Sequence, residues 1–396
     1  HERAGEIVYT HVSGLTYEVK IITYTYSPSP ADRPELEISW GDGTTSILPR
    51  SSLQDLTPVI RRNEYTGQHT YAGGGTFNIS VEDPNRNYGI VNIPNSVNIP
   101  FFIQTQLVIN PFLGSNNSVV LLNPPLDYGC VNRLYIHNPG AYDPDGDSIS
   151  YKLTVCRGAG GLPIPGYSLP SASNEFSIDE ITGDLIWDKP LVQGEYNVAF
   201  IIEEWRSGVR IGYVTRDLQI KIDACNNDPP EIFTIDDTCV VAGTDLTFPV
   251  TAEDPNGHKV LLSASGGPFL QEVSPAVMDD NPAIGNGSVT TNFNWSTQCE
   301  HVKKNPYSVF FKAFDDSAGS NSNNFISLSS YKTVSIQVVA PAVELIQATP
   351  LGNSIQLAWN QTECENAKGY VVYRNTTATG FVPGHCETGV PSYTGY

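Results

Sequence analysis

Three aspartates at alternate positions surround a glycine near the middle of the chain, at Asp143, Asp145 and Asp147. Gly146 permits a tight turn there, so the three carboxylates can converge on one point. Carboxylate oxygens grouped in this way suit a hard cation such as Ca²⁺, which takes six to eight oxygen ligands. The spacing therefore predicts a calcium site. The competing interpretation is a solvated turn held by hydrogen bonds from the backbone to the aspartates.

The sequence shows none of the motifs that mark common enzyme classes. It has no G-x-S-x-G, no H-E-x-x-H, no P-loop and no dinucleotide-binding glycine pattern, and its seven histidines are scattered along the chain. Asp42 and His69 are types used in catalysis, but turn geometry also explains them. Cys299 and His301 lack the second Cys/His pair of a zinc site. We therefore expect no enzyme.

Composition narrows the class of protein further. The 396 residues include 42 acidic and 22 basic side chains, a formal charge of −20, so long-range electrostatics disfavours nucleic acid and anionic membranes. No apolar run of about 18 residues is present, and we expect no membrane span. With 34 Gly and 29 Pro against only 16% charged residues, the chain is rich in turns and poor in the ion pairs of surface helices.

Short β-branched runs recur between turn residues and predict strands throughout. Examples are residues 17–25, 76–81, 148–155 and 209–222, each bounded by Gly, Pro, Asn or Asp. No convincing window shows the apolar spacing of an amphipathic helix. The fold class predicted is all-β, made of tandem immunoglobulin-like β-sandwich domains in an elongated rod, with a separate core in each domain and Pro-stiffened links between domains.

The seven cysteines point to an oxidising compartment. The chain begins with His1 and not Met, and we expect that a signal peptide has been removed. An exported chain would oxidise its cysteines to disulfides, and the odd number leaves one without a partner in this chain. We therefore expect a secreted or cell-surface protein.

The first unit, residues 1–111, contains the sequence W-G-D-G-T from Trp40 and H-T-Y from His69. Asp-Gly between alternating strands favours a hairpin, Trp40 is expected in the core, and Tyr71 is expected to pack at a corner. This pattern resembles the PKD domain, an immunoglobulin-like sandwich. The resemblance implies a structural role for Asp42 and His69.

The second unit, residues 112–226, combines the D-P-D-G-D loop with a T-G-D-L-I-W hairpin and the sequence G-E-Y. This order resembles cadherin-like and related immunoglobulin-like modules of bacterial surface proteins. The junction from Asp223 to Pro230 is similar to the calcium-binding linker of cadherins, although Cys225 and Asn226 interrupt its spacing. The resemblance implies that Asp223 and Asp228 add calcium ligands between domains.

Two further units follow. Residues 227–341 repeat the sandwich pattern, with D-P-N-G at Asp254 matching the loop at Asp143 about 110 residues earlier. Residues 342–396 resemble the start of a fibronectin type III domain, with Trp359 and the Tyr-rich run from Gly369 to Arg374. About 50 residues are too few for such a sandwich, so we expect the natural chain to continue past Tyr396.

The disulfide candidates are six cysteines, and the expected pairings follow the units. Cys239 and Cys299 suggest a bridge between the sheets of the third unit, and Cys364 with Cys386 suggests a loop disulfide. In the second unit, Cys130 with Cys156 and Cys156 with Cys225 both remain open. The six candidates are Cys130, Cys156, Cys239, Cys299, Cys364 and Cys386.

Over its whole length the chain resembles large surface proteins of Bacteroidota that are associated with gliding motility. The phrases that carry this resemblance start at His1, Asn123 and His385. It implies a non-catalytic structural or adhesive stalk or filament component, exported by the type 9 secretion system. The implied partners are other cell-surface or secretion-system proteins, copies of itself, or surface polysaccharide.

A second hypothesis is a carbohydrate-binding or spacer segment of a larger secreted enzyme. Aromatic side chains stack on sugar rings, and Tyr142, Tyr167 and Trp205 lie in loop-rich sequence where they could do so. The same side chains are equally suited to the core of a β-sandwich.

Overall fold

The structure is a computed structural model that describes residues 2–316, 326–377, 380–382, 384, 386, 387 and 389–394. The described residues form strands joined by turns and five short 3-10 segments, and none of them lies in an α-helix. The predicted all-β class is confirmed. No helix in this part of the chain is long and apolar enough to span a membrane. The 3-10 segments are η1 (Ser96–Asn98), η2 (Ala159–Gly161), η3 (Gly267–Leu270), η4 (Cys299–His301) and η5 (Ser392–Thr394).

The first unit is one antiparallel sheet of seven strands, in the order β1-β2-β5-β4-β3-β6-β7. Its outer strands β1 and β7 also contact each other, so the sheet encloses its own core. Trp40, Tyr65 and Leu107 are among the buried side chains of that core. The strands are β1 (Glu2–Ser13), β2 (Thr16–Tyr26), β3 (Glu35–Ser39), β4 (Thr45–Thr57), β5 (Ile60–Thr70), β6 (Gly75–Asp83) and β7 (Phe101–Ile109).

The second unit pairs β9, β16, β15 and β12 on one side and β10, β14 and β13 on the other. Trp187 and Phe200 are fully buried between these layers. The strands are β8 (Val120–Leu121), β9 (Tyr128–Cys130), β10 (Leu134–His137), β11 (Ala141–Tyr142), β12 (Ser148–Thr154), β13 (Phe176–Ile178), β14 (Leu185–Asp188), β15 (Gly194–Arg206) and β16 (Val209–Asp223).

Strands β15 and β16 form a long hairpin whose turn follows from two residues. Ser207 and Gly208 have positive φ values of 52° and 77° and connect Arg206 directly to its partner Val209. Two positive φ values in a two-residue loop match a type I′ turn, whose twist suits the flanking strands. Consecutive residues of β16, such as Asp217 and Leu218, are buried and point to opposite faces of the sheet, as expected of a central strand.

One edge of β16 joins the first unit to the second. Along this edge, residues 212–214 pair with β7, Asp217 and Leu218 pair with β1, and residues 221–223 pair with β9. The opposite edge pairs with β15 over nearly its whole length. Both outer strands of the first unit, β1 and β7, are therefore paired with the same strand of the second unit. Eleven strands belong to this one continuous sheet.

The core of the second unit also takes side chains from the first. Ala4, Ile22, Tyr24 and Ile60 pack in the same buried cluster as Trp187. The boundary that we expected after residue 111 therefore does not separate two independent domains. Separating them would expose paired strand edges and split a core, so the two units should fold together.

The third unit is a two-sheet sandwich. One sheet has the order β17-β19-β23-β21 and the other β18-β25-β24-β20-β22. This arrangement corresponds to the immunoglobulin fold, with strands A, B, E and D facing strands C, F and G. The strands are β17 (Glu231–Phe233), β18 (Thr238–Val241), β19 (Asp245–Glu253), β20 (Lys259–Gly266), β21 (Val277–Met278), β22 (Ala283–Asn286), β23 (Ser288–Ser296), β24 (Tyr307–Asp316) and β25 (Ser329–Val339).

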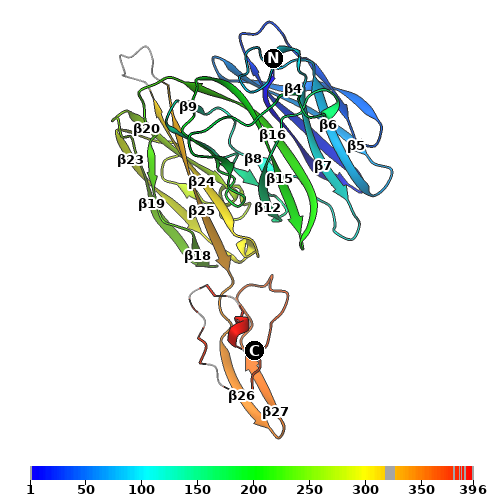
Figure 1. The fold of residues 1–396 in the computed structure, drawn as a ribbon. Coiled ribbons are helices and arrows are strands. Elements are labelled where there is room, and N and C mark those ends of the chain that lie inside the picture. Colours follow the sequence, from blue (N-terminus) through cyan, green and yellow to red (C-terminus); the bar gives the residue numbers. More distant parts are fainter. Residues whose placement is uncertain are drawn as a thin grey trace.

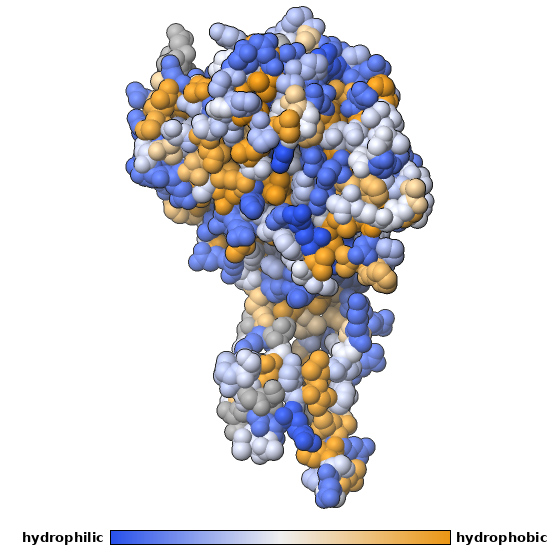
Figure 2. Space-filling model, turned by 45° about the vertical axis from the view of Figure 1, so that its right-hand side comes forward, coloured by the Kyte–Doolittle hydropathy of each residue, from blue (hydrophilic) through white to orange (hydrophobic). Residues whose placement is uncertain are grey.

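The fourth unit contributes the hairpin β26 (Leu345–Leu351) and β27 (Ser354–Trp359). Figure 1 shows the first three units side by side in one body, with this hairpin extending away from it. That arrangement is more compact than the rod that we expected. Figure 2 shows hydrophobic side chains along the extension, and Ile355, Leu357, Val371 and Val372 are exposed there.

Candidate functional site

The W-G-D-G motif of the first unit forms a structural corner. The indole of Trp40 is buried, and the imidazole of His69 stacks on it with ring centroids 4.7 Å apart. His69 Nε2 lies 2.7 Å from Asp42 Oδ2, and the hydroxyl of Tyr71 donates to the carbonyl of Trp40 at 3.0 Å. Hydrogen bonds from Thr44 and His69 lower the pKa of Asp42 to about 2. These contacts bind the turn to the strands.

The D-P-D-G-D loop lies between β11 and β12, where Gly146 has a φ of 79°. Its three carboxylates have different environments. Asp143 accepts the backbone N–H of Asp147 at 3.0 Å and is nearly buried. Asp145 accepts two hydrogen bonds from Asn117, both at 2.7 Å. The loop thus shows the backbone and side-chain hydrogen bonds of the turn interpretation.

Arg206, at the end of β15, supplies the positive charge beside this loop. Its Nη2 lies 2.6 Å from Asp147 Oδ2 and 3.3 Å from Asp145 Oδ2. Its Nη1 donates to the carbonyls of Leu113 and Ser115 at 2.7 and 2.8 Å. The guanidinium therefore anchors the segment between the first two units. A calcium ion bound by the same carboxylates would have to displace it, so the residues present do not fit calcium in this conformation.

Glu204 also belongs to this site, although it was not among the residues predicted from the sequence. It is fully buried beside Asp143, and its Oε1 accepts hydrogen bonds from Val119 N at 3.0 Å and from Asn116 Nδ2 at 3.5 Å. Burial, together with Asp143, raises the pKa of Glu204 well above its usual range. Burial likewise raises the pKa of Asp143 to about 6. The two carboxyls interact and are held together best when one is protonated.

The other two predicted calcium ligands lie elsewhere. Asp223, at the end of β16, has its carboxylate 2.7 Å from Lys221 Nζ. Asp228 forms an ion pair with Arg133 at 2.5 Å. The five predicted ligands thus take part in three separate groups, each with a protein cation. Calcium at these residues stays a prediction.

The structure pairs the cysteines differently from our expectation. The disulfides are Cys130–Cys225, Cys239–Cys386 and Cys299–Cys364. Both bridges expected in the third and fourth units, Cys239–Cys299 and Cys364–Cys386, are therefore wrong. So are the two pairings of Cys156, which is buried and free. The spacing favours pairing within each unit, but the third unit is bonded to the fourth.

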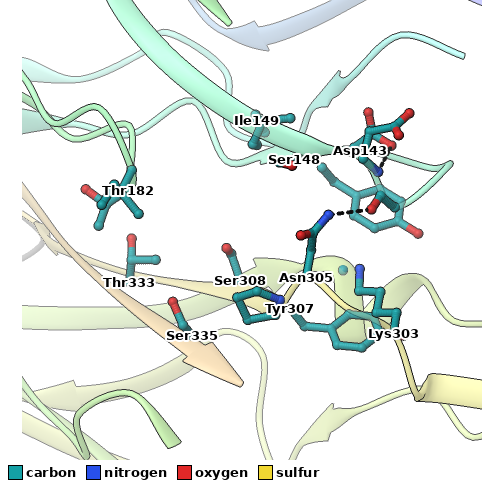
Figure 3. A pocket seen from close by; sticks show the side chains of 17 residues that line it. Asp143, Ser148, Ile149, Thr182, Lys303, Asn305, Tyr307, Ser308, Thr333 and Ser335 are labelled. Atoms are coloured by element: carbon teal, nitrogen blue, oxygen red, sulfur yellow. Dashed lines mark hydrogen bonds between the residues drawn. The ribbon is translucent and has the colours of Figure 1, made fainter. Parts of the chain in front are cut away.

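A cavity of about 190 Å³ lies between the second and third units. Figure 3 shows Asp143 and Ser148 on one side of it, with Lys303, Asn305 and Tyr307 on the other. Asn305 Nδ2 donates to the carbonyl of Gly146 at 2.9 Å, which bridges the two units. Burial lowers the pKa of Lys303 to about 8, and its ammonium lies 3.8 Å from the centre of the Tyr307 ring.

The interface beyond this cavity is polar and buried. Asp127 lies 2.6 Å from Lys312 Nζ and accepts the hydroxyl of Tyr331 at 2.7 Å, both from the third unit. His137 Nδ1 lies 2.6 Å from the same carboxylate. Although burial raises it, the neighbouring Lys312 and His137 hold the pKa of Asp127 well below its usual range. The second and third units are thus fixed to each other through a buried charge.

The aromatic residues suggested for sugar binding are only partly exposed. Tyr142, Tyr167 and Trp205 are each half-buried. Tyr167 donates its hydroxyl to the carbonyl of Asn197 at 3.2 Å, and Trp205 donates its indole N–H to Ser150 Oγ at 2.9 Å. Tyr142 lines the cavity between units. Their contacts are those of packed structural residues.

No protein family and no curated protein matches this sequence. Among solved structures, the chain is similar to a chimeric titin Z1Z2 tandem, to EC1-2 of human protocadherin-24, and to domains 4 and 5 of the S-layer protein SbsC. The identities are 11%, 18% and 11%, with TM-scores of 0.20, 0.22 and 0.18. The matches cover 56%, 58% and 66% of this chain and 100%, 100% and 96% of those chains. Scores this low carry no argument about function, so the immunoglobulin-like assignment rests on the strand order.

Proposed function

We propose that this protein is a non-catalytic structural and adhesive component outside the cell, built to withstand tension along the chain. The observation that carries the proposal is the placement of two disulfides. Cys130–Cys225 and Cys239–Cys386 close segments with sequence separations of 95 and 147 residues. A chain pulled at its ends transmits tension through these covalent bonds, and the strands inside the closed segments cannot be drawn out.

Nearly all of the second and third units lies inside the two closed segments. Only short stretches and the first unit remain outside them, and the first unit is held by pairing of β1 and β7 with β16. Shearing this edge would have to break the pairing at five register positions together, two with β1 and three with β7. Both features resist extension without any catalytic group.

Disulfides of this kind persist in oxidising compartments and support an extracellular location. The specific role we propose follows the sequence resemblance: a stalk or filament component on the surface of a gliding bacterium, exported by the type 9 secretion system. Its partners would be other surface or secretion-system proteins, or further copies of itself. The net charge of −20 favours the solubility of a protein with such a surface.

A clean deletion in the source organism tests this role, scored for single-cell movement and for attachment under flow. The deletion strain should lose movement, attachment or both. Protease added to intact cells of the parent strain should cleave the protein. Complementation by the Cys130→Ser/Cys225→Ser double variant should restore attachment in still medium but not under flow. The control Cys156→Ala leaves all three disulfides in place and should restore both. Normal movement and attachment in the deletion strain would contradict the proposal.

A further inference from the structure

The second and third units repeat one polar cluster at a constant offset of 111 residues. In the second unit, Asn116 donates to Glu204, and the first aspartate of the D-P-D-G loop lies beside that carboxyl. In the third unit, Asn227 Nδ2 donates to Asp315 Oδ2 at 2.6 Å. The corresponding positions are Asn116 and Asn227, Asp143 and Asp254, Asp147 and His258, and Glu204 and Asp315.

The backbone hydrogen bonds repeat as well. Asp254 Oδ1 accepts the N–H of His258 at 2.8 Å, just as Asp143 accepts the N–H of Asp147. Asp315 Oδ1 also accepts a backbone N–H, from Leu328 at 2.8 Å, and Glu204 Oε1 accepts one from Val119 at 3.0 Å, but these two donors are not equivalent positions of the repeat. The two loops therefore place equivalent side chains in equivalent positions.

The two clusters differ in the cation beside the carboxylates. In the second unit, Arg206 lies against the loop and pairs with Asp147. The residue 111 positions after Arg206 is a serine in the sequence, and His258 stands where the second unit has Asp147. The third unit has thus exchanged a carboxylate and a guanidinium for an imidazole, which is a metal ligand when neutral.

Ligand atoms of three side chains converge in the third unit. One atom each from Asp254, His258 and Asp315 lies within 4.8 Å of the others. The Asp254 side chain is fully buried, yet its Oδ2 accepts no hydrogen bond from the described residues. A buried carboxylate oxygen without a partner is costly unless a cation compensates it.

We propose that Asp254, His258 and Asp315 bind one divalent transition-metal ion, with Zn²⁺ as the reference ion. Two carboxylates and one imidazole form a mixed oxygen and nitrogen donor set, which suits zinc better than calcium, whose protein ligands are oxygens. Because tetrahedral zinc bonds of about 2.0–2.2 Å place the ligand atoms about 3.4 Å apart, separations of up to 4.8 Å would have to shorten on binding. The His258 side chain, 25% exposed beside two buried aspartates, is the ligand with room to move.

The metal would stabilise the attachment of the linker at Asn227 and Asp228, which joins the second unit to the third, to the body of the third unit. Asn227 belongs to that junction and holds Asp315, and Asp228 N donates to Asn256 Oδ1 within the D-P-N-G loop at 2.8 Å. A hydrogen bond from Asn227 that orients a metal-binding carboxylate is the usual outer support of such sites. This inference is independent of the mechanical role proposed above.

Equilibrium dialysis and calorimetry with ZnCl₂ on the chelator-treated full chain test the proposal. The wild type should bind one equivalent of Zn²⁺ saturably, and its Tm should rise with zinc. His258→Gln should weaken zinc binding at least ten-fold, because it removes the nitrogen ligand and leaves the buried carboxylates in place. His11→Gln, which changes a histidine of the first unit, is the matched control and should bind zinc as the wild type does.

Co²⁺ in place of zinc gives a readout that does not depend on stability. Its visible absorption should appear on binding to the wild type and to Asp147→Asn, the repeat-equivalent variant, but should be lost in His258→Gln. Absence of saturable zinc binding to the wild type would overturn the proposal. So would equal binding by His258→Gln, or saturable binding of Ca²⁺ without binding of Zn²⁺.

Discussion

The guanidinium of Arg216 lies 3.0 Å from the carboxylate of Glu6, and neither side chain is more than 1% exposed. Arg216 is on β16 and Glu6 is on β1, so this buried ion pair joins two units that are distant in sequence. Asp217, the next residue, makes a second buried pair with Arg86 at 2.6 Å. Burying four charges in this way is stable only while each keeps its partner.

Glu6→Gln should therefore destabilise the first and second units together. The substitution leaves the Arg216 charge buried without its counter-charge, which typically costs about 3–5 kcal/mol. Denaturant unfolding followed by fluorescence and circular dichroism measures this loss. Arg61→Gln, which removes the exposed pair with Asp55, is the control and should cost about 0–1 kcal/mol. Equal losses in the two variants would mean that the buried pair does not hold the units together.

The stability should fall as pH rises through the raised pKa values of Asp143 and Glu204. Because these pKa values are higher in the folded state, the folded protein binds more protons above about pH 4, and the added stability is lost on deprotonation. Glu204→Gln keeps a neutral group in place and should raise the Tm at pH 8 relative to the wild type, with little change at pH 5. Glu203→Gln is the neighbouring control. If Glu204→Gln changed the Tm by the same amount at pH 5 and at pH 8, the proposal that Asp143 and Glu204 share a proton would be refuted.

Arg206→Gln should make the acidic loop sensitive to calcium. The variant removes the guanidinium from Asp145 and Asp147, so the carboxylates repel one another and can accept a metal ion. We expect CaCl₂ at about 5 mM to raise the Tm of Arg206→Gln by several degrees and that of the wild type much less. Adding Asp145→Asn to the variant should remove the rise. An equal rise in the wild type would instead support the calcium site first predicted from the sequence.

Cys156 should be the single free thiol. It is buried, and burial raises the pKa of its thiol well above the usual range, so reagents should not reach it in the folded protein. Thiol titration should find none in the native state and one after denaturation without reductant. Cys156→Ala should reduce the second value to zero. Three or more thiols in the denatured protein would contradict the disulfide pattern.

Local features of the fold were predictable because their causes are local. Asp-Gly turns, the buried Trp40 and Trp187, and the alternating strands follow from neighbouring residues. Pairing of β16 with β1 could not be predicted, because it joins segments about 210 residues apart and leaves no periodic signal. The same reason explains the wrong disulfide pairings.

The acidic loop was located correctly, but the side chains that surround it were not predicted. The carboxylates of Asp143 and Asp147 form a pattern in the sequence, whereas Glu204 and Arg206 lie on β15, about 60 residues further along the chain. Aligning the two repeats at the D-P-D-G and D-P-N-G loops would have matched Glu204 with Asp315, since the offset is constant. That comparison was available in the sequence and points to both clusters.

Pulling single molecules by their two ends tests the mechanical account most directly. With the disulfides intact, residues between Cys130 and Cys225 and between Cys239 and Cys386 should contribute no extension. Reduction should then release further contour length of about 330 Å and about 510 Å, from separations of 95 and 147 residues at about 3.5 Å each. The same release should occur in Cys156→Ala. An oxidised protein that extends to the full length of its 396 residues would contradict the account.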